Sequence, residues 1–356
     1  MPPIPGATAV LSHRRPARAA GATRPVNRSL RIALQVAVSL AVLAILLVQI
    51  DVSRTVDLVR ASDLAPLGLA LAIFVATTWL MAWRWQLLLR SKGIDEPIGW
   101  LTRLYFVSYA AGQVLPTAVG GDAVRIVEHA RRRPDVRAEA AGAVLLERVV
   151  GATATLVLVA LGLAVAAGRY DDVALLVWVE LAGVAIIAAV AFLLFSRRTR
   201  RVLETRVFPL GRRIRVEAPL ERVHAALHGY REERGALCVV LGLTLAAQLA
   251  RMMAIWLCGE AVGLDLSPLV YVIFGPLLFL VMLVPFTING LGVREAFFVA
   301  FLGRFGIDVD AAFATGFLFY VVTVATSIPG GVILLWRSVH PAAPRAARVE
   351  GPVDPS

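Results

Sequence analysis

Two short segments of the chain combine proline, glycine and arginine in an order that could bind an anion. The first runs Pro116-Thr-Ala-Val-Gly-Gly-Asp-Ala-Val-Arg125, and the second runs Pro285-Phe-Thr-Ile-Asn-Gly-Leu-Gly-Val-Arg294. Proline and glycine interrupt a helix and expose backbone N–H groups, and a helix that restarts beside an arginine suits an anionic group such as phosphate. The sequence therefore predicts two anion-binding helix starts.

These segments and their charged neighbours supply the candidate residues for a site that binds a lipid headgroup. The glycines allow close approach of the backbone, Asp122 is expected to cap the new helix, and Arg125 and Arg294 are expected to contact phosphate. The full candidate set is Pro116, Gly120, Gly121, Asp122, Arg125, Glu147, Arg148, Asn289, Gly290, Gly292, Arg294 and Glu295.

Charged residues inside apolar segments allow two interpretations. Burying Glu147 or Arg148 in a bilayer costs about 2.5 to 3.5 kcal/mol on insertion scales. A structural ion pair, with each other or with Arg125, explains them as well as a role in substrate binding does, and Glu295 beside Arg294 leaves the same choice. The remaining charges in apolar segments are isolated in the sequence, and we expect interfacial or structural roles for them: Arg84, Glu180 and Arg251.

The elements that position these residues are membrane helices. Of 356 residues, 58% are apolar and 17% charged, and the mean hydropathy is +0.75. Apolar runs near twenty residues match the length that a helix needs to cross the hydrocarbon. The sequence predicts an all-α polytopic membrane protein with two broken, re-entrant segments, 98–119 and 268–305. Its six full helices are expected at 30–50, 64–89, 139–167, 173–195, 236–258 and 311–336, with a short outer connection at 51–63.

The positive charge indicates orientation. The formal net charge is +11, and arginines concentrate in the N-terminal tail 1–29 and in the loop 196–234. Because cytoplasmic segments of membrane proteins carry excess positive charge, we expect this loop and both tails, 1–29 and 339–356, in the cytoplasm and the protein in the plasma (inner) membrane. The basic loop is expected to contact anionic lipid headgroups. A nucleic-acid partner is not expected, because a solvated fold would be needed to present the charge.

An internal repeat organises the domain 30–338. A shift of 169 residues superimposes the two Pro/Gly/Arg segments, and the same shift places the helix at 64–89 on that at 236–258. The units cover about 64–167 and 233–336, and each consists of a helix, a broken segment and a helix. The expected threading gives the two units opposite orientations, which is typical of transporters with inverted repeats.

Metal, cofactor and nucleotide chemistry find no support in the sequence. The five histidines form no metal-binding spacing, Cys238 and Cys258 form no CxxC motif, and no phosphate-binding loop of the GxxxxGK[ST] type occurs. We therefore expect no metal and no cofactor.

The three motifs together, Leu115 to Arg125, Glu147 to Gly151 and Pro285 to Glu295, resemble the flippase-like transmembrane domain of lysylphosphatidylglycerol synthases. The similarity extends over nearly the whole chain. It implies translocation of a lipid with a charged headgroup. The cytoplasmic domain that transfers the amino acid in the bifunctional synthases has no counterpart after the last helix, so the resemblance implies no synthase activity.

The leading hypothesis is accordingly a transporter, not an enzyme, that flips a phospholipid or polyprenyl-linked lipid. Two alternatives remain open. One is a lipid-dependent integral-membrane transferase that uses Asp122, Glu147 or the outer carboxylates Asp51, Asp57 and Asp63 as acid or base. The other is a non-catalytic subunit that holds a partner glycosyltransferase or lipid-modifying enzyme through the 196–234 loop.

Overall fold

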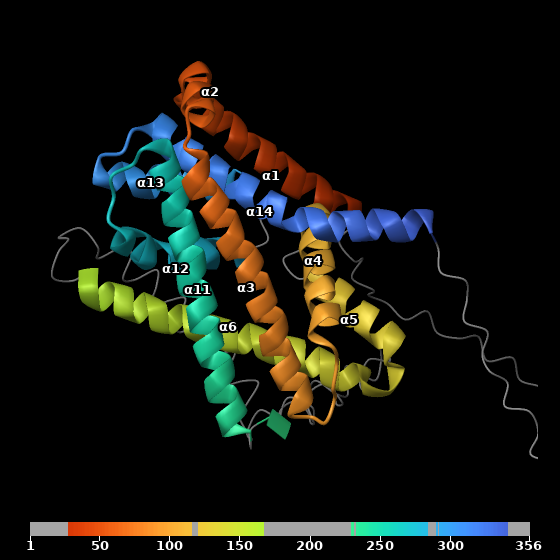
Figure 1. Cartoon of the computed structure of the whole chain (residues 1–356). Helices are drawn as coiled ribbons and strands as arrows, with labels where there is room; N and C mark the ends of the chain where they lie inside the picture. Colours follow the sequence, from red (N-terminus) through yellow and green to blue (C-terminus); the bar gives the residue numbers. More distant parts are fainter. Residues whose placement is uncertain are drawn as a thin grey trace, which may run out of the picture.

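The computed structural model describes residues 28–115, 120–166, 229–230, 233–283, 290 and 292–340, and these residues form helices and their connections (Figure 1). The α-helices are α1 (Arg28–Gln49), α2 (Val52–Arg60), α3 (Leu64–Arg90), α4 (Ile98–Val114), α5 (Gly120–Arg132), α6 (Arg137–Ala166), α11 (Arg234–Val262), α12 (Pro268–Leu283), α13 (Val293–Leu302) and α14 (Val309–Val339). The all-α prediction is confirmed.

Four helical segments are long and apolar enough to cross a membrane: Leu64–Arg90, Pro134–Gly162, Arg234–Val262 and Val309–Val339. A fifth candidate joins the end of α1 to α2 across a bend of 91°. The predicted helix at 173–195, the basic loop up to residue 228 and both tails lie outside the described residues.

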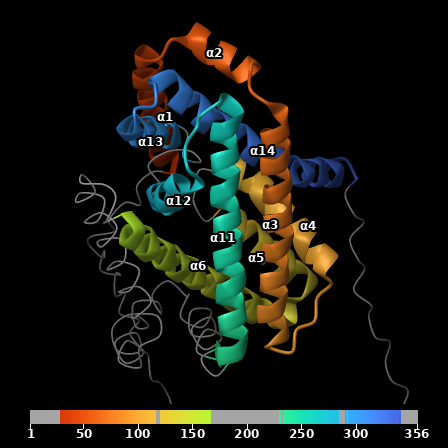
Figure 2. The same cartoon turned by 60° about the vertical axis from the view of Figure 1, so that its left-hand side comes forward.

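Helices α3 and α11 run antiparallel at the centre of the fold, side by side in both views (Figures 1 and 2). At one end, the backbone N–H of Asp63 donates to the carbonyl of Ala261 at 2.9 Å. At the other end, the Tyr230 hydroxyl donates to the carbonyl of Leu88 at 3.0 Å. The two helices that begin the proposed repeat units therefore point in opposite directions.

The first broken segment is a hairpin of α4 and α5. Arg132, at the end of α5, lies over the ring of Trp100, near the start of α4, at 4.5 Å from its centroid. Both ends of the hairpin thus lie at one side. The predicted bounds of the re-entrant segment, 98–119, are too short, because the hairpin continues through α5 to Arg132. The helices approach closely where α5 begins, because a Cβ on Gly121 would lie 2.4 Å from the carbonyl oxygen of Ser108.

The second broken segment is a hairpin of α12 and α13, held by aromatic rings. Phe274 of α12 stacks on Phe301 of α13, with ring centroids 4.6 Å apart. Before α13 the chain turns through Gly290 and Gly292, whose φ angles of 74° and 83° favour glycine. Residues 284–289 and 291 lie outside the described residues.

The packing of the helices follows the proposed repeat. The offset of 169 residues relates α3, α4, α5 and α6 to α11, α12, α13 and α14, in that order. Helix α4 packs on α14, and its counterpart α12 packs on α6, the counterpart of α14. This exchange of partners is what a two-fold relation between the units would produce, and the inverted repeat stays a prediction.

Most of the connection expected at 51–63 is a helix, α2, which was not predicted from the sequence. Asp51 caps this helix by accepting a bond from the Arg54 backbone N–H at 3.1 Å. The Arg54 guanidinium then lies 3.4 Å from Asp308 and 3.6 Å from Asp310, and these contacts attach α2 to the start of α14. Five of the nine residues of α2 are polar or charged, so a search for long apolar runs does not find this helix.

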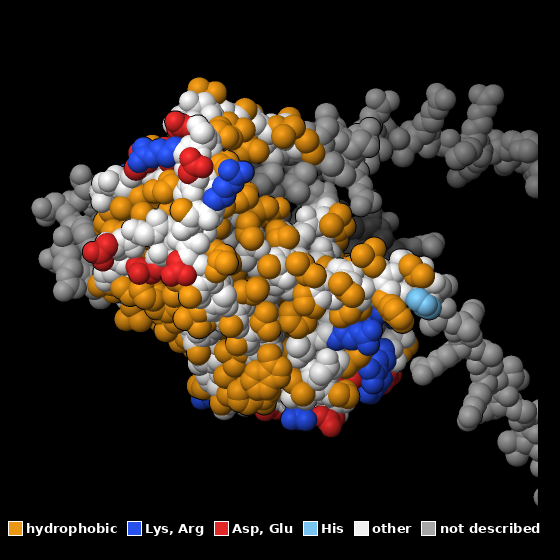
Figure 3. Space-filling model, turned by 45° about the horizontal axis from the view of Figure 1, so that its top comes forward, with side chains coloured by type: hydrophobic (Ala, Val, Ile, Leu, Met, Phe, Trp, Pro, Cys, Tyr) orange, Lys and Arg blue, Asp and Glu red, His pale blue; other side chains and the backbone are white. Residues whose placement is uncertain are grey.

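The surface is consistent with a lipid environment. Figure 3 shows apolar side chains over most of one face, with charged residues gathered toward its margins. Large apolar residues along the spanning helices are exposed, among them Trp79, Val332 and Trp336. Contiguous apolar surface of this kind is rare on soluble proteins.

Candidate functional site

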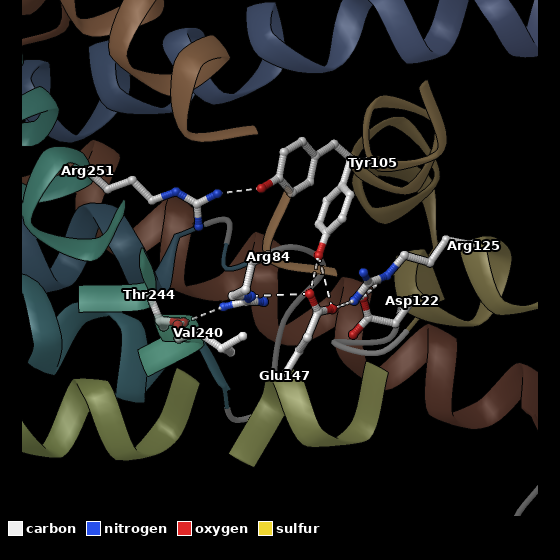
Figure 4. A network of polar contacts seen from close by, with 9 residues as sticks. Arg84, Tyr105, Asp122, Arg125, Glu147, Val240, Thr244 and Arg251 are labelled. Carbon is white, nitrogen blue, oxygen red and sulfur yellow. Dashed lines mark hydrogen bonds and ion pairs between the residues drawn. The ribbon is translucent and has the colours of Figure 1, made fainter. Parts of the chain in front are cut away.

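A buried carboxylate, Glu147 of α6, is the centre of a network of polar contacts inside the helix bundle (Figure 4). One of its oxygens lies 2.7 Å from the Arg125 guanidinium of α5, and the other lies 3.2 Å from the Arg84 guanidinium of α3. The Tyr105 hydroxyl of α4 donates to both oxygens, at 2.8 and 3.0 Å. Glu147 therefore joins four helices through charge-assisted hydrogen bonds, which are the stronger kind.

Arg125 lies among aromatic rings. The centre of its guanidinium is 4.4 Å from the ring centroid of Tyr105 and 4.8 Å from that of Trp85. Rings stabilise a cation by their electron-rich faces, and more strongly where water is excluded. One guanidinium nitrogen, Nη1, has no hydrogen-bond partner in the described part of the chain. Arg125 is thus held firmly and still has an unused donor.

A second carboxylate, Asp122, joins α5 to α6 beside this centre. Its Oδ1 lies 3.0 Å from Arg125, and its Oδ2 lies 2.6 Å from Arg148. The side chain of Arg148 is 37% exposed, whereas that of Arg125 is 3% exposed. Asp122 lies inside the first turn of α5, which begins at Gly120, so it is not the residue that precedes the helix as the predicted cap would be; both of its oxygens bind arginines instead. The polar network extends from the buried centre toward the surface at Arg148.

Helix α11 contributes polar groups to the opposite side of the network. Its Thr244 hydroxyl accepts a bond from Arg84 at 3.0 Å. Seven residues further along, Arg251 donates to the hydroxyls of Tyr109 and Thr77. The rings of Tyr105 and Tyr109 meet edge to face at 6.3 Å and connect the two regions of the network.

The network contains more arginines than carboxylates among its buried and partly buried contacts. Arg84, Arg125 and Arg251 accompany the carboxylates Asp122 and Glu147, and Arg148 lies at the partly exposed end of the network. Within the described residues, no carboxylate lies within ion-pair distance of Arg251. A positive charge without such a partner at membrane depth is costly unless an anion neutralises it.

The second hairpin places its charges differently. Arg294 pairs with its neighbour Glu295 at 2.8 Å, and both side chains are buried. The other oxygen of Glu295 accepts the backbone N–H of Gly292 at 2.7 Å. The Arg294 guanidinium also lies over the ring of Tyr320, 4.5 Å from its centroid. This pair neutralises itself, and in the described part of the chain no hydrogen bond or ion pair joins it to the first network.

Most of the predicted site residues lie in one of these two places. Arg125 and Glu147 form the predicted ion pair, and Gly120 and Gly121 open helix α5 beside them. Pro116 and Asn289 lie outside the described residues. The structure thus brings the first motif, which contains Asp122 and Arg125, together with the adjacent residues Glu147 and Arg148. The second motif, with Arg294 and Glu295, lies in a separate cluster.

Arg84 and Arg251, which are isolated charges in the sequence, have polar partners in the structure. Arg84 is 6% exposed and binds Glu147, a residue 63 positions away, and Arg251 bridges α11 to α3 and α4. Sequence reasoning also missed Tyr105 and Thr244. The available signal was the location of both arginines inside long apolar runs, where a charge needs a partner. Within the described residues no three potential ligands gather as a metal site would require.

Fold and site together define the class of the protein: a multi-pass α-helical membrane protein with an arginine-rich polar interior. The chain belongs to the family of the lysylphosphatidylglycerol synthase transmembrane region, whose model matches residues 32–330. The glycosyltransferase AglD of Haloferax volcanii is a relative, 26% identical over 344 residues, and the match covers 86% of this chain and 54% of AglD. The chain therefore spans about half the length of this curated relative. The family connects the chain with a membrane-lipid-related function.

Proposed function

We propose that the protein translocates lipids with phosphate-containing headgroups across the membrane, with the headgroup in the polar interior and the hydrocarbon chains in the bilayer. The observation that carries this proposal is that arginines outnumber carboxylates in the first network, where no carboxylate of the described residues lies within ion-pair distance of Arg251. An arginine without such a partner costs about 2.5 to 3.5 kcal/mol on insertion scales. A lipid phosphate would supply the missing negative charge, and guanidinium groups bind phosphate well.

We infer different roles for the arginines of the network from their surroundings. Glu147 and Asp122 hold Arg125 in place, and preorganised groups bind a ligand without a cost of ordering. Arg148 is the most exposed of the group's ion-paired arginines and is the expected point of first contact with a headgroup.

The sequence suggested that Arg125 and Arg294 hold one headgroup together, and this stays untested. Glu295 already balances Arg294 in its own cluster. We therefore place the headgroup at the first network and assign the second pair a structural role.

The test is lipid movement in proteoliposomes that contain the purified protein. The panel is headgroup-labelled phosphatidylglycerol, its aminoacyl derivative, a polyprenyl-phosphate sugar and phosphatidylcholine. We expect protein-dependent movement of at least one phosphate lipid, reduced about tenfold by Arg148→Gln because one charge-assisted contact is lost. Arg131→Gln is the matched control, since Arg131 lies on α5 with its side chain 74% exposed. Folded protein that moves no lipid of the panel would refute the proposal.

A second candidate function rests on the similarity to AglD, a protein named as a glycosyltransferase. In this case the chain would be the membrane part of a system that transfers sugars from lipid-linked donors, either as a transferase or as the subunit that holds one. Incubation of the purified protein with a radiolabelled polyprenyl-phosphate sugar and acceptor lipid distinguishes the two functions. Sugar transfer without lipid movement would favour the second candidate.

A further inference from the structure

Arg251 lies deep in a membrane helix. It is seventeen residues from the first residue of α11 and eleven from the last. At a rise of about 1.5 Å per residue, at least about 16 Å of helix separates it from either end. Because the hydrocarbon core is about 30 Å thick, this guanidinium lies near its middle, where snorkelling to the interface is least available.

The contacts of Arg251 are with neutral groups. Its Nε lies 3.4 Å from the Thr77 hydroxyl oxygen, and its Nη2 donates to the Tyr109 hydroxyl. Its guanidinium centre is 5.7 Å from the ring centroid of Phe74. Within the described residues, no carboxylate lies within ion-pair distance of Arg251. By contrast, each of Arg84, Arg125 and Arg294 has a carboxylate within 3.2 Å.

The surroundings of Arg251 can accept an anion. The Tyr109 hydroxyl accepts a bond from Arg251, so its own proton remains to be donated to an oxygen of a bound group. A phosphate in this place would receive the guanidinium and the tyrosine hydroxyl together. The Thr77 hydroxyl already donates to the carbonyl of Phe74 at 2.9 Å and is used in positioning Arg251.

Polar groups connect Arg251 to the first network along one side of α11. Thr244, Gln248 and Arg251 follow one another at spacings of four and three residues, which places them on one face of the helix. Thr244 binds Arg84, and Gln248 donates to the carbonyl of Gly151 on α6 at 2.9 Å. The polar face continues for about 10 Å along the helix axis.

We propose that Arg251 is a second binding site for the phosphate group of an anionic lipid, deeper in the membrane than the Arg148 end of the network. This inference rests on the proposed function and extends it. A headgroup would pass from the first network along the polar face of α11 to Arg251 and Tyr109. The two sites divide the crossing of the membrane into shorter steps.

The experiment measures binding, separately from transport. The full chain is purified in a neutral detergent, and phosphatidylglycerol is titrated while thermal unfolding is followed. We expect wild type to be stabilised, and Arg251→Gln to need an at least about tenfold higher lipid concentration for the same shift. Arg251→Lys retains the charge and should bind more tightly than Arg251→Gln. Arg54→Gln is the matched control, since Arg54 lies on α2 with its side chain 60% exposed.

A second variant keeps the test valid if Arg251→Gln does not fold. Thr77→Glu places a carboxylate beside the Arg251 guanidinium, which is 3.4 Å from the replaced hydroxyl. This internal anion should stabilise the lipid-free protein and weaken the response to phosphatidylglycerol. An unchanged lipid response in Thr77→Glu would overturn the proposal.

Further arms identify the source of the phosphate and separate this inference from the proposed function. Equal stabilisation by soluble glycerol phosphate, or by phosphatidylcholine, would overturn the assignment to anionic lipid. Lipid-dependent stabilisation that Arg251→Gln abolishes, in a protein that moves no lipid, would retain the site and refute translocation. Normal lipid movement and binding in folded Arg251→Gln would refute the site and retain translocation.

Discussion

Glu147 holds two arginines and a tyrosine hydroxyl in place at once, and much of the order of the polar interior depends on this single carboxylate. Its pairing with Arg125 was among the alternatives predicted from the sequence, because both charges occur in motifs beside apolar helices. The participation of Arg84 was not predictable in the same way. It depends on where α3 crosses α6, and a single sequence does not contain that crossing point.

Replacing Glu147 with Gln should destabilise the protein strongly. The amide cannot balance Arg84 and Arg125, and loss of one partner of a buried ion pair costs about 3 to 5 kcal/mol. Denaturant unfolding in detergent micelles measures the change. The control is Glu128→Gln on α5, whose carboxylate is 23% exposed and pairs with Arg131 and Arg337. Because exposed pairs contribute about 0 to 1 kcal/mol, equal losses in the two variants would contradict this account.

At the scale of elements, the apolar runs predicted the spanning helices closely. The predicted ranges 64–89 and 236–258 correspond to Leu64–Arg90 and Arg234–Val262, because apolar length alone defines a membrane helix. The breaks in both segments were also predicted, since proline and glycine interrupt a helix, but the first segment was predicted to end at residue 119, whereas its hairpin continues to Arg132. Helix α2 was missed, because its stability depends on a cap and on ion pairs with a distant segment.

A glycine sets the closest approach between α14 and α4. A Cβ on Gly330 would lie 1.8 Å from the backbone carbonyl oxygen of Phe106, whereas a Cβ on the adjacent Gly331 would meet nothing within 4 Å. Backbone atoms cannot move aside as a flexible side chain can. The sequence shows two equivalent glycines, and only the helix crossing distinguishes them.

Gly330→Ala should therefore separate α14 from α4, and we expect a loss of at least about 1 to 3 kcal/mol, the range for overpacking. Gly331→Ala is the matched control and should be neutral or slightly stabilising, because alanine favours helix more than glycine does. The midpoints of thermal unfolding of the two purified variants, measured in the same detergent, test the difference. A Gly331→Ala variant that is the less stable of the two would show that this helix contact is wrongly placed.

At the scale of the whole molecule, the antiparallel central helices and the hairpins predict which residues face each side of the membrane. Asp57 of α2 is exposed at one end, and Arg131 of α5 is exposed at the other. Because cytoplasmic segments carry excess positive charge, we expect Arg131 inside and Asp57 outside.

Cysteine labelling tests this orientation in a background in which Cys238 and Cys258 are replaced by serine. An impermeant maleimide should label Asp57→Cys in intact cells, and should label Arg131→Cys only after the membrane is opened. Labelling of Arg131→Cys in intact cells would show that this end of the first hairpin faces outward. That result would contradict the prediction that the hairpin enters the membrane from the cytoplasm.

The unequal numbers of arginines and carboxylates in the interior also have an electrical consequence. If a lipid phosphate neutralises part of this excess, the protein carries more charge through the membrane when its site is empty than when it is occupied. One elementary charge that crosses the whole potential contributes about 2.3 kcal/mol per 100 mV. The membrane potential would then act mainly on the return of the empty site, and an inside-negative membrane would hold that site toward the cytoplasm.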